Sequence, residues 1–122
     1  VRNKIEEYGI KLLGIDSDGD VSALAGPLLD AGVNLSYPLE IGAWNADPME
    51  FRKRYGRELR IIGGFNKMVI EKGPVEIDAE IERRLPIMKD GGYLLLPDHL
   101  ITPGASLQNY IYYLEKVRNL RF

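Results

Sequence analysis

Four short apolar runs, set far apart along the chain, constrain the fold more than any other feature. They are the segments 10–16, 33–40, 59–65 and 92–98. Their residues are almost continuously apolar rather than alternating, which is typical of strands buried on both faces of a parallel sheet. The centres of successive runs lie 23, 26 and 33 residues apart. These intervals are too long for hairpins and favour strand–helix–strand crossovers.

Helix signals fill the intervals between the runs. Asp47 followed by Pro48 predicts a capped helix start, and Gly56 predicts the end of that helix. Ser106 predicts the cap of a last helix. Two stripes at helical spacing predict buried faces; they are Ile77, Ile81, Leu85 and Met88, with Pro86 as a predicted kink, and Leu107, Tyr110, Leu114 and Val117.

This alternation predicts an α/β fold with four parallel strands. Such a sheet belongs either to a small doubly wound domain or to half of an eight-stranded barrel. The 122 residues suffice for one domain, over 1–122, with a modest core. In either architecture, functional groups are expected at the carboxyl ends of the strands.

Composition excludes several classes of function. The formal net charge is −2, so no basic surface indicates nucleic-acid binding. The chain has no cysteine, which rules out disulfides and thiolate metal sites. No apolar run approaches the roughly 20 residues that span a membrane. The first residues resemble the end of a helix and are too charged for a signal peptide. We therefore expect a cytoplasmic protein without membrane contact.

Carboxylates and the only histidine stand where the predicted strands end. Asp16 and Asp18 follow the first run, and their spacing of two points both to one side of an extended segment. His99 follows the last run. Two carboxylates and an imidazole suit a divalent metal of the zinc or manganese kind, and they equally suit acid–base chemistry. The alternative is structural: a turn with a helix cap for the acids, and a loop hydrogen bond for His99.

The two middle runs end in further candidates. Glu40 closes a mostly apolar strand, so its carboxylate either bonds to backbone amides or to Lys67, or it points into a pocket as a catalytic group. Gly63 and Gly64, with Lys67 nearby, allow a phosphate or carboxylate of a cofactor to lie against the backbone. A plain turn explains the glycine pair equally simply.

The last segment, "PDHLITPGASLQNYIYYLEKVRNL", resembles the C-terminal motif of uroporphyrinogen decarboxylases. That motif runs roughly Gly-His-Gly-x-x-Pro-x-x-x-x-x-Asn, and His99, Pro103 and Asn109 fall in matching places. Asp98 and Leu100 replace its glycines. The segment "AGVNLSYPLEIGAWNADPMEFRKRYGRELRIIGGFNK" is similar to a preceding region of the same superfamily.

The resemblance implies the C-terminal half of a (β/α)8 TIM barrel, about strands five to eight. The superfamily contains decarboxylases of tetrapyrrole synthesis, which need no cofactor, and methyltransferases that work with a corrinoid protein. In the methyltransferases, a His-x-Cys pair and a later Cys bind zinc; aligned here, these positions are Asp16, Asp18 and His99. The "PLE" strand end is closer to the methyltransferase branch, so metal-assisted methyl transfer of a small-molecule substrate is our first expectation.

A half-barrel has a physical problem of its own. Its outer strands carry unpaired edges, and the barrel interior lies open to water. We therefore expect a partner: an N-terminal half-barrel, or a second copy in a homodimer. The isolated chain is expected to be inactive because half of the pocket walls are missing, and a non-catalytic assembly module is the third hypothesis.

Overall fold

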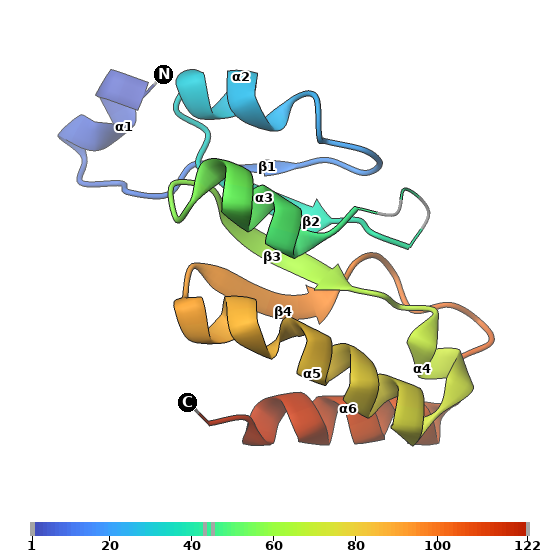
Figure 1. Cartoon of the computed structure of the whole chain (residues 1–122). Coiled ribbons are helices and arrows are strands. Elements are labelled where there is room, and N and C mark those ends of the chain that lie inside the picture. The colour runs from blue at the N-terminus through green and yellow to red at the C-terminus, as the bar shows by residue number, and fades with distance from the viewer. Residues whose placement is uncertain (1, 43, 45, 122) are drawn as a thin grey trace.

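Four parallel strands alternate with helices in the computed structural model, which describes residues 2–42, 44 and 46–121. The strands are β1 (Gly14–Asp16), β2 (Leu35–Leu39), β3 (Arg60–Phe65) and β4 (Tyr93–Pro97). The helices are α1 (Arg2–Glu7), α2 (Ala25–Asp30), α3 (Pro48–Tyr55), α4 (Val69–Lys72), α5 (Pro74–Asp90) and α6 (Leu107–Asn119). The sheet order is β1-β2-β3-β4 (Figure 1). The predicted α/β alternation is confirmed.

β1 is shorter than its apolar run. Pairing with β2 begins only at Gly14, opposite Leu35, whereas Ile10 and Leu12 are about half exposed. The side chain of Asn34 accepts a hydrogen bond of 2.9 Å from the backbone N–H of Leu13 and fixes the start of the strand. Only the last three residues of the run 10–16 therefore join the sheet.

Within the described residues, the helices cover one face of the sheet and leave the other bare. Ile61 of β3 and Leu95 of β4 point towards the helices and are buried. The alternating residues Leu94 and Leu96 point the other way and are 55% and 38% exposed. A doubly wound domain carries helices on both faces. This arrangement excludes that alternative and is consistent with half of a barrel, in which helices lie only on the outside.

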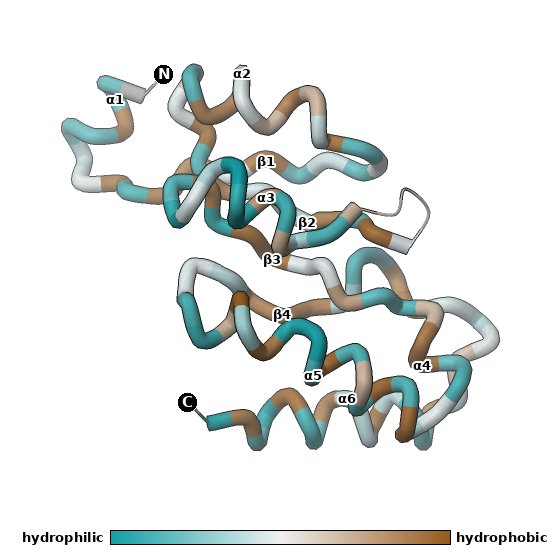
Figure 2. Tube along the Cα trace, in the orientation of Figure 1, coloured by the Kyte–Doolittle hydropathy of each residue, from teal (hydrophilic) through white to brown (hydrophobic). Residues whose placement is uncertain are grey.

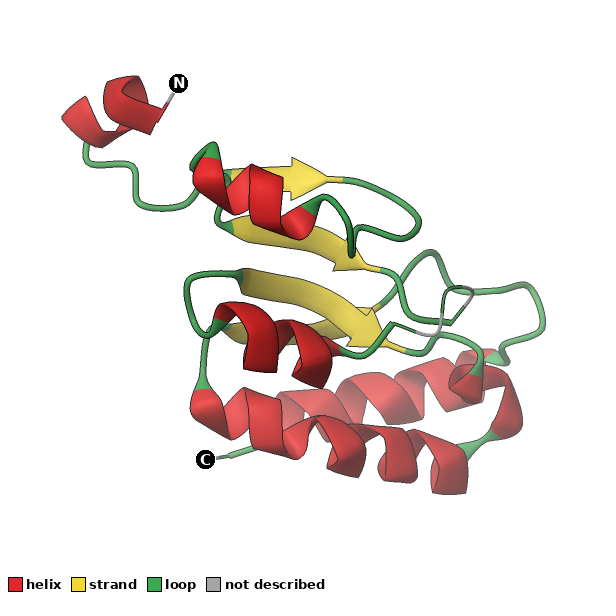
Figure 3. Ribbon diagram, turned by 45° about the horizontal axis from the view of Figure 1, so that its top comes forward, coloured by secondary structure: helices red, strands yellow, loops and turns green. Residues whose placement is uncertain are grey.

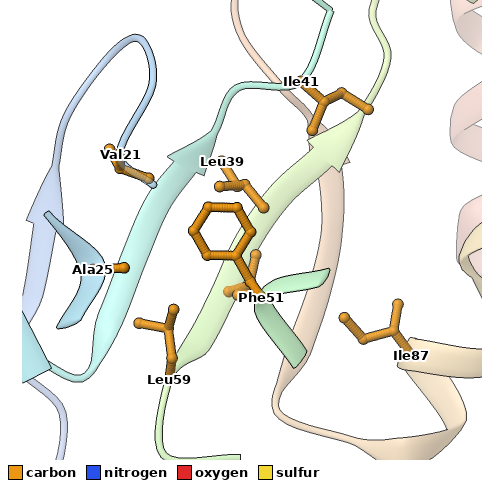
Figure 4. Packing of buried hydrophobic residues seen from close by; sticks show 8 residues of the cluster. Val21, Ala25, Leu39, Ile41, Phe51, Leu59 and Ile87 are labelled. Atoms are coloured by element: carbon orange, nitrogen blue, oxygen red, sulfur yellow. The ribbon is translucent and has the colours of Figure 1, made fainter. Parts of the chain in front are cut away.

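Two hydrophobic clusters join the helices to this covered face. The strand segments are among the most apolar of the chain (Figure 2). The first cluster surrounds the ring of Phe51 from α3 (Figure 4). The second contains Phe65 of β3 and Tyr113 of α6, whose ring centroids lie 4.6 Å apart. Burial of the apolar side chains of α3, α5 and α6 against the strands is the main stabilising contribution.

The predicted helix ends are largely confirmed. Asp47 accepts a hydrogen bond of 2.9 Å from the N–H of Met49, and Gly56 ends α3 with a positive φ of 58°. Ser106 caps α6 by accepting from the N–H of Asn109. α5 continues through Pro86 as one helix.

One residue of the predicted buried stripe on α6 is misplaced. Leu107 is 71% exposed, because the packed face of the helix is centred on Tyr113 instead.

At the other end of the chain, α1 stands apart from the sheet (Figure 3). None of the helices in the described ranges is both long and apolar enough to cross a membrane.

Two buried tyrosines provide a matched test of the second cluster. Burial raises the pKa of both hydroxyls, so both stay protonated. The Tyr93 hydroxyl donates to the carbonyl of Gly63 at 2.8 Å, whereas the Tyr113 hydroxyl has no partner among the described residues. We expect Tyr93→Phe to lower the free energy of unfolding by about 1 kcal/mol, and Tyr113→Phe to leave it equal or raise it. Urea unfolding measures both; a larger loss in Tyr113→Phe would contradict this assignment.

Candidate active site at the ends of β1 and β4

The carboxyl ends of the two outermost strands line one cavity. Asp16 ends β1, Asp18 lies in the loop after it, and His99 follows β4; all three line a cavity of about 400 Å³. A flat four-stranded sheet would hold its edge strands about 14 Å apart. Instead, Nε2 of His99 lies 3.6 Å from Oδ1 of Asp18. The sheet and its end loops therefore curve towards the bare face.

The rest of the cavity wall is mostly apolar. It comprises Tyr37 and Pro38 of β2, Leu96 and Pro97 of β4, Leu100 and Ile101 of the following loop, and Tyr110 of α6. Within the described residues no lysine or arginine lines this cavity. The site thus combines an acidic and imidazole wall with an aromatic and aliphatic one, an arrangement suited to a small ligand with an apolar part.

The three predicted metal ligands share the cavity but are not gathered into a metal centre. The donor types, two carboxylates and one imidazole, fit a divalent ion of the zinc or manganese kind. In the described part of the chain, however, no three His, Cys, Asp or Glu side chains lie close enough together to hold an ion. The Asp18 side chain is 70% exposed and free to turn. Metal binding would have to draw the exposed carboxylates towards His99.

Glu40 and Lys67 bind each other rather than the cavity. Nζ of Lys67 lies 3.6 Å from Oε1 of Glu40, and both side chains are mostly buried. The other carboxylate oxygen of Glu40 accepts a hydrogen bond of 2.7 Å from the N–H of Gly19. The structure thus shows both structural roles considered for Glu40, a hydrogen bond with a backbone amide and an ion pair with Lys67. They tie the loop after β1 to the ends of β2 and β3.

Each member of the glycine pair has a packing reason in the structure. A Cβ added to Gly63 would lie 2.7 Å from the backbone nitrogen of Leu39, and one added to Gly64 would lie 2.6 Å from the ring of Pro48. Both glycines also have positive φ, at 111° and 71°. Close approach of β2 and α3 therefore accounts for Gly63 and Gly64, and their predicted role in holding a cofactor stays a prediction.

A buried carboxylate next to His99 organises the whole end of the sheet, and sequence reasoning missed it. Asp98 is fully buried. Its Oδ2 accepts from the N–H groups of Ile41 at 3.0 Å and Gly42 at 2.8 Å, and its Oδ1 accepts from the N–H of Lys67 at 3.0 Å. One side chain thus joins the loops after β2, β3 and β4. The argument that singled out Glu40, a charge at the end of an apolar strand, applies to Asp98 equally.

Other predicted loop residues have local roles. Hydrogen bonds from the side chain and backbone of Ser22 hold the pKa of Asp20 below its usual value, so Asp20 shapes the turn after β1. The side-chain amide of Asn109 donates to the carbonyl of Ile70 at 2.8 Å and anchors the start of α6 to α4. The asparagine of the family-like motif is therefore structural in this chain.

Comparisons with known proteins do not assign the chain to a family. A scan against protein-family models finds none that matches, and a search of curated proteins finds no match. The resemblance to uroporphyrinogen decarboxylases thus stays a prediction, and the geometry of the cavity has to carry the functional argument.

Asp98→Ala tests the role of the buried carboxylate. The substitution leaves three backbone N–H groups without their acceptor, so we expect it to lower the free energy of unfolding by about 3 kcal/mol. Asp18→Ala, at an exposed carboxylate after the strand at the opposite edge of the sheet, should leave stability nearly unchanged. Urea denaturation followed by circular dichroism compares the two; equal small losses would show that Asp98 does not hold the loops together.

Proposed function

We propose that the chain is the C-terminal half of a (β/α)8 barrel of the uroporphyrinogen decarboxylase-like superfamily, with the cavity between β1 and β4 as its part of the active site. Within that superfamily we favour metal-assisted methyl transfer with a corrinoid-bearing partner, in the cytoplasm. The observation that supports this best is the convergence of Asp16, Asp18 and His99, from opposite edges of the sheet, on one cavity.

Each of these side chains has a part in the proposed chemistry. Asp16, Asp18 and His99 would hold a divalent ion, and such an ion supplies Lewis-acid activation of a bound group. The apolar wall, with Tyr37, Leu96 and Tyr110, would hold the body of the substrate and limit access of water. Asp98 keeps His99 in place through its bonds to the neighbouring loops.

Decarboxylation of a tetrapyrrole is the second candidate, and the charges of the site rank it lower. A substrate with several carboxylates requires cationic contacts. Lys67, the cation in the loop after β3, already pairs with Glu40. The groups that do line the cavity include two acids, which would repel such a substrate. His99 is the feature that favours this candidate, through the resemblance of its motif.

Zinc and manganese titrations test the metal site on the chain itself. We expect one ion to bind per chain, measured by calorimetry, and Asp18→Ala to raise the dissociation constant at least about tenfold because one anionic ligand is lost. Asp20→Ala is the matched control, since Asp20 lies in the same loop and holds Ser22 instead. Equal affinities of all three proteins would refute the proposed ligand set.

Activity requires a complete barrel that contains this chain. Supplied with methylcobalamin and a small thiol, such a protein should transfer the methyl group from cobalt to sulfur: the cobalt–carbon bond breaks, the thiol loses its proton to solvent, and cob(I)alamin and a thioether form. Loss of the methylcobalamin absorbance measures this reaction. His99→Gln should slow this reaction by roughly 100-fold or more, whereas Asp20→Asn should not change it. Consumption of uroporphyrinogen in place of methylcobalamin would instead identify a decarboxylase.

A further inference from the structure

The bare face of the sheet is an apolar surface without a partner in the described part of the chain. We define it by Tyr37, Ile62, Leu94 and Leu96, of which Tyr37 and Leu94 are 43% and 55% exposed. Leu94 lies opposite Ile62 in the register of β3 and β4, so the apolar side chains are contiguous. Contiguous exposed apolar side chains of this kind mark an interaction surface.

The chain exposes more surface than a compact monomer of its mass does. The excess is similar to the area that one partner buries in a stable dimer. The chain exposes 7478 Å² and has a mass of 13.8 kDa. A compact monomer of that mass exposes about 6,600 Å², so the excess is roughly 850 Å². A stable interface of standard size buries about 800 Å² on each partner. The excess therefore matches one side of such an interface.

We infer that, where no N-terminal half-barrel covers it, the bare face of this chain is covered by a second copy, and that the two copies close an eight-stranded parallel barrel. Four strands are half of the eight in such a barrel. A two-fold rotation about the barrel axis keeps every strand direction unchanged, so β4 of one copy continues in parallel to β1 of its partner, and the reverse. Both free edges disappear in this closed arrangement, and no edge remains for further growth.

Exposed apolar side chains flank both edges that would meet. On α6, next to β4, Leu107 and Ile111 lie four residues apart and are 71% and 45% exposed. Before β1, the exposed apolar side chains are Tyr8, Ile10 and Leu12. Leu107 and Ile111 lie at the carboxyl end of the sheet and Tyr8, Ile10 and Leu12 at its amino end, so closure would bring apolar side chains to both ends of each of the two identical junctions.

Closure would also complete the site. His99 follows β4, and the partner's Asp16 and Asp18 follow the strand that would lie beside β4 across the junction. Each His99 would then face carboxylates from both copies. Assembly of the dimer is inferred from the bare face and does not depend on methyl transfer. The sedimentation experiment below can therefore fail while the metal titration succeeds, and the reverse.

Sedimentation velocity at low micromolar concentration tests the assembly. The expected species has twice the mass of 13.8 kDa. Leu94→Arg places a charge in the proposed interface and should raise the dissociation constant by roughly 100-fold, giving a folded monomer because Leu94 is already exposed in the single chain. Val75→Arg is the control: Val75 on α5 is 77% exposed and lies among the outer helices. A monomeric wild-type chain, or equal dissociation of both variants, would overturn the inference.

Crosslinking distinguishes a closed barrel from other dimers, and the absence of native cysteine makes it simple. Leu12→Cys lies just before β1, and Leu94→Cys lies in β4. In a closed barrel β1 adjoins the partner's β4, so a short bismaleimide should join Leu12→Cys to Leu94→Cys in a mixture faster than it joins either variant to itself. Crosslinking within either single variant at the same rate, or growth of long polymers, would overturn the closed arrangement.

Discussion

The carboxylate of Asp98 is the interaction on which the rest of the site depends. A fully buried charge is costly unless it is hydrogen-bonded, and three backbone N–H groups from the loops after β2 and β3 meet that requirement. The same three bonds fix the relative positions of those loops. Because His99 is the next residue, these bonds also fix the backbone from which its imidazole extends towards Asp18.

A second, weaker set of bonds holds the opposite side of the cavity. Glu40 accepts from the N–H of Gly19 and pairs with Lys67, so the loop that carries Asp18 is connected to the ends of β2 and β3. Farther from the cavity, Glu80 and Arg84 form a buried pair on α5, and Arg84 also reaches Asp47 at the start of α3. Ion pairs thus connect the end of β2 with the loop after β3, and α5 with the start of α3.

Sequence periodicity was sufficient for the four strands and the long helices and insufficient for the short helix α4 and for the finer packing. The apolar runs located all four strands, and Asp47, Gly56 and Ser106 located helix ends, because these signals act within a few residues. Leu107 was misplaced because the orientation of α6 depends on the fit between Tyr113 and Phe65, which are far apart in sequence. For the same reason the partners of Glu40, Lys67 and Asp98 could be found only in three dimensions. Asp16, Asp18 and His99 do line one cavity, as their places at the strand ends indicated, and their role as metal ligands stays a prediction.

The two walls of the cavity differ in how firmly they are supported. His99 directly follows Asp98, whose carboxylate is fully buried, whereas the side chain of Asp18 is exposed to solvent. His99 would therefore hold a fixed position towards an incoming ligand, whereas the side chain of Asp18 could change its position. The backbone on both sides of Asp18 is held, because the N–H of Ser17 donates to the carbonyl of Tyr37 and the N–H of Gly19 donates to Glu40, so accommodation of different ligands falls to the Asp18 side chain.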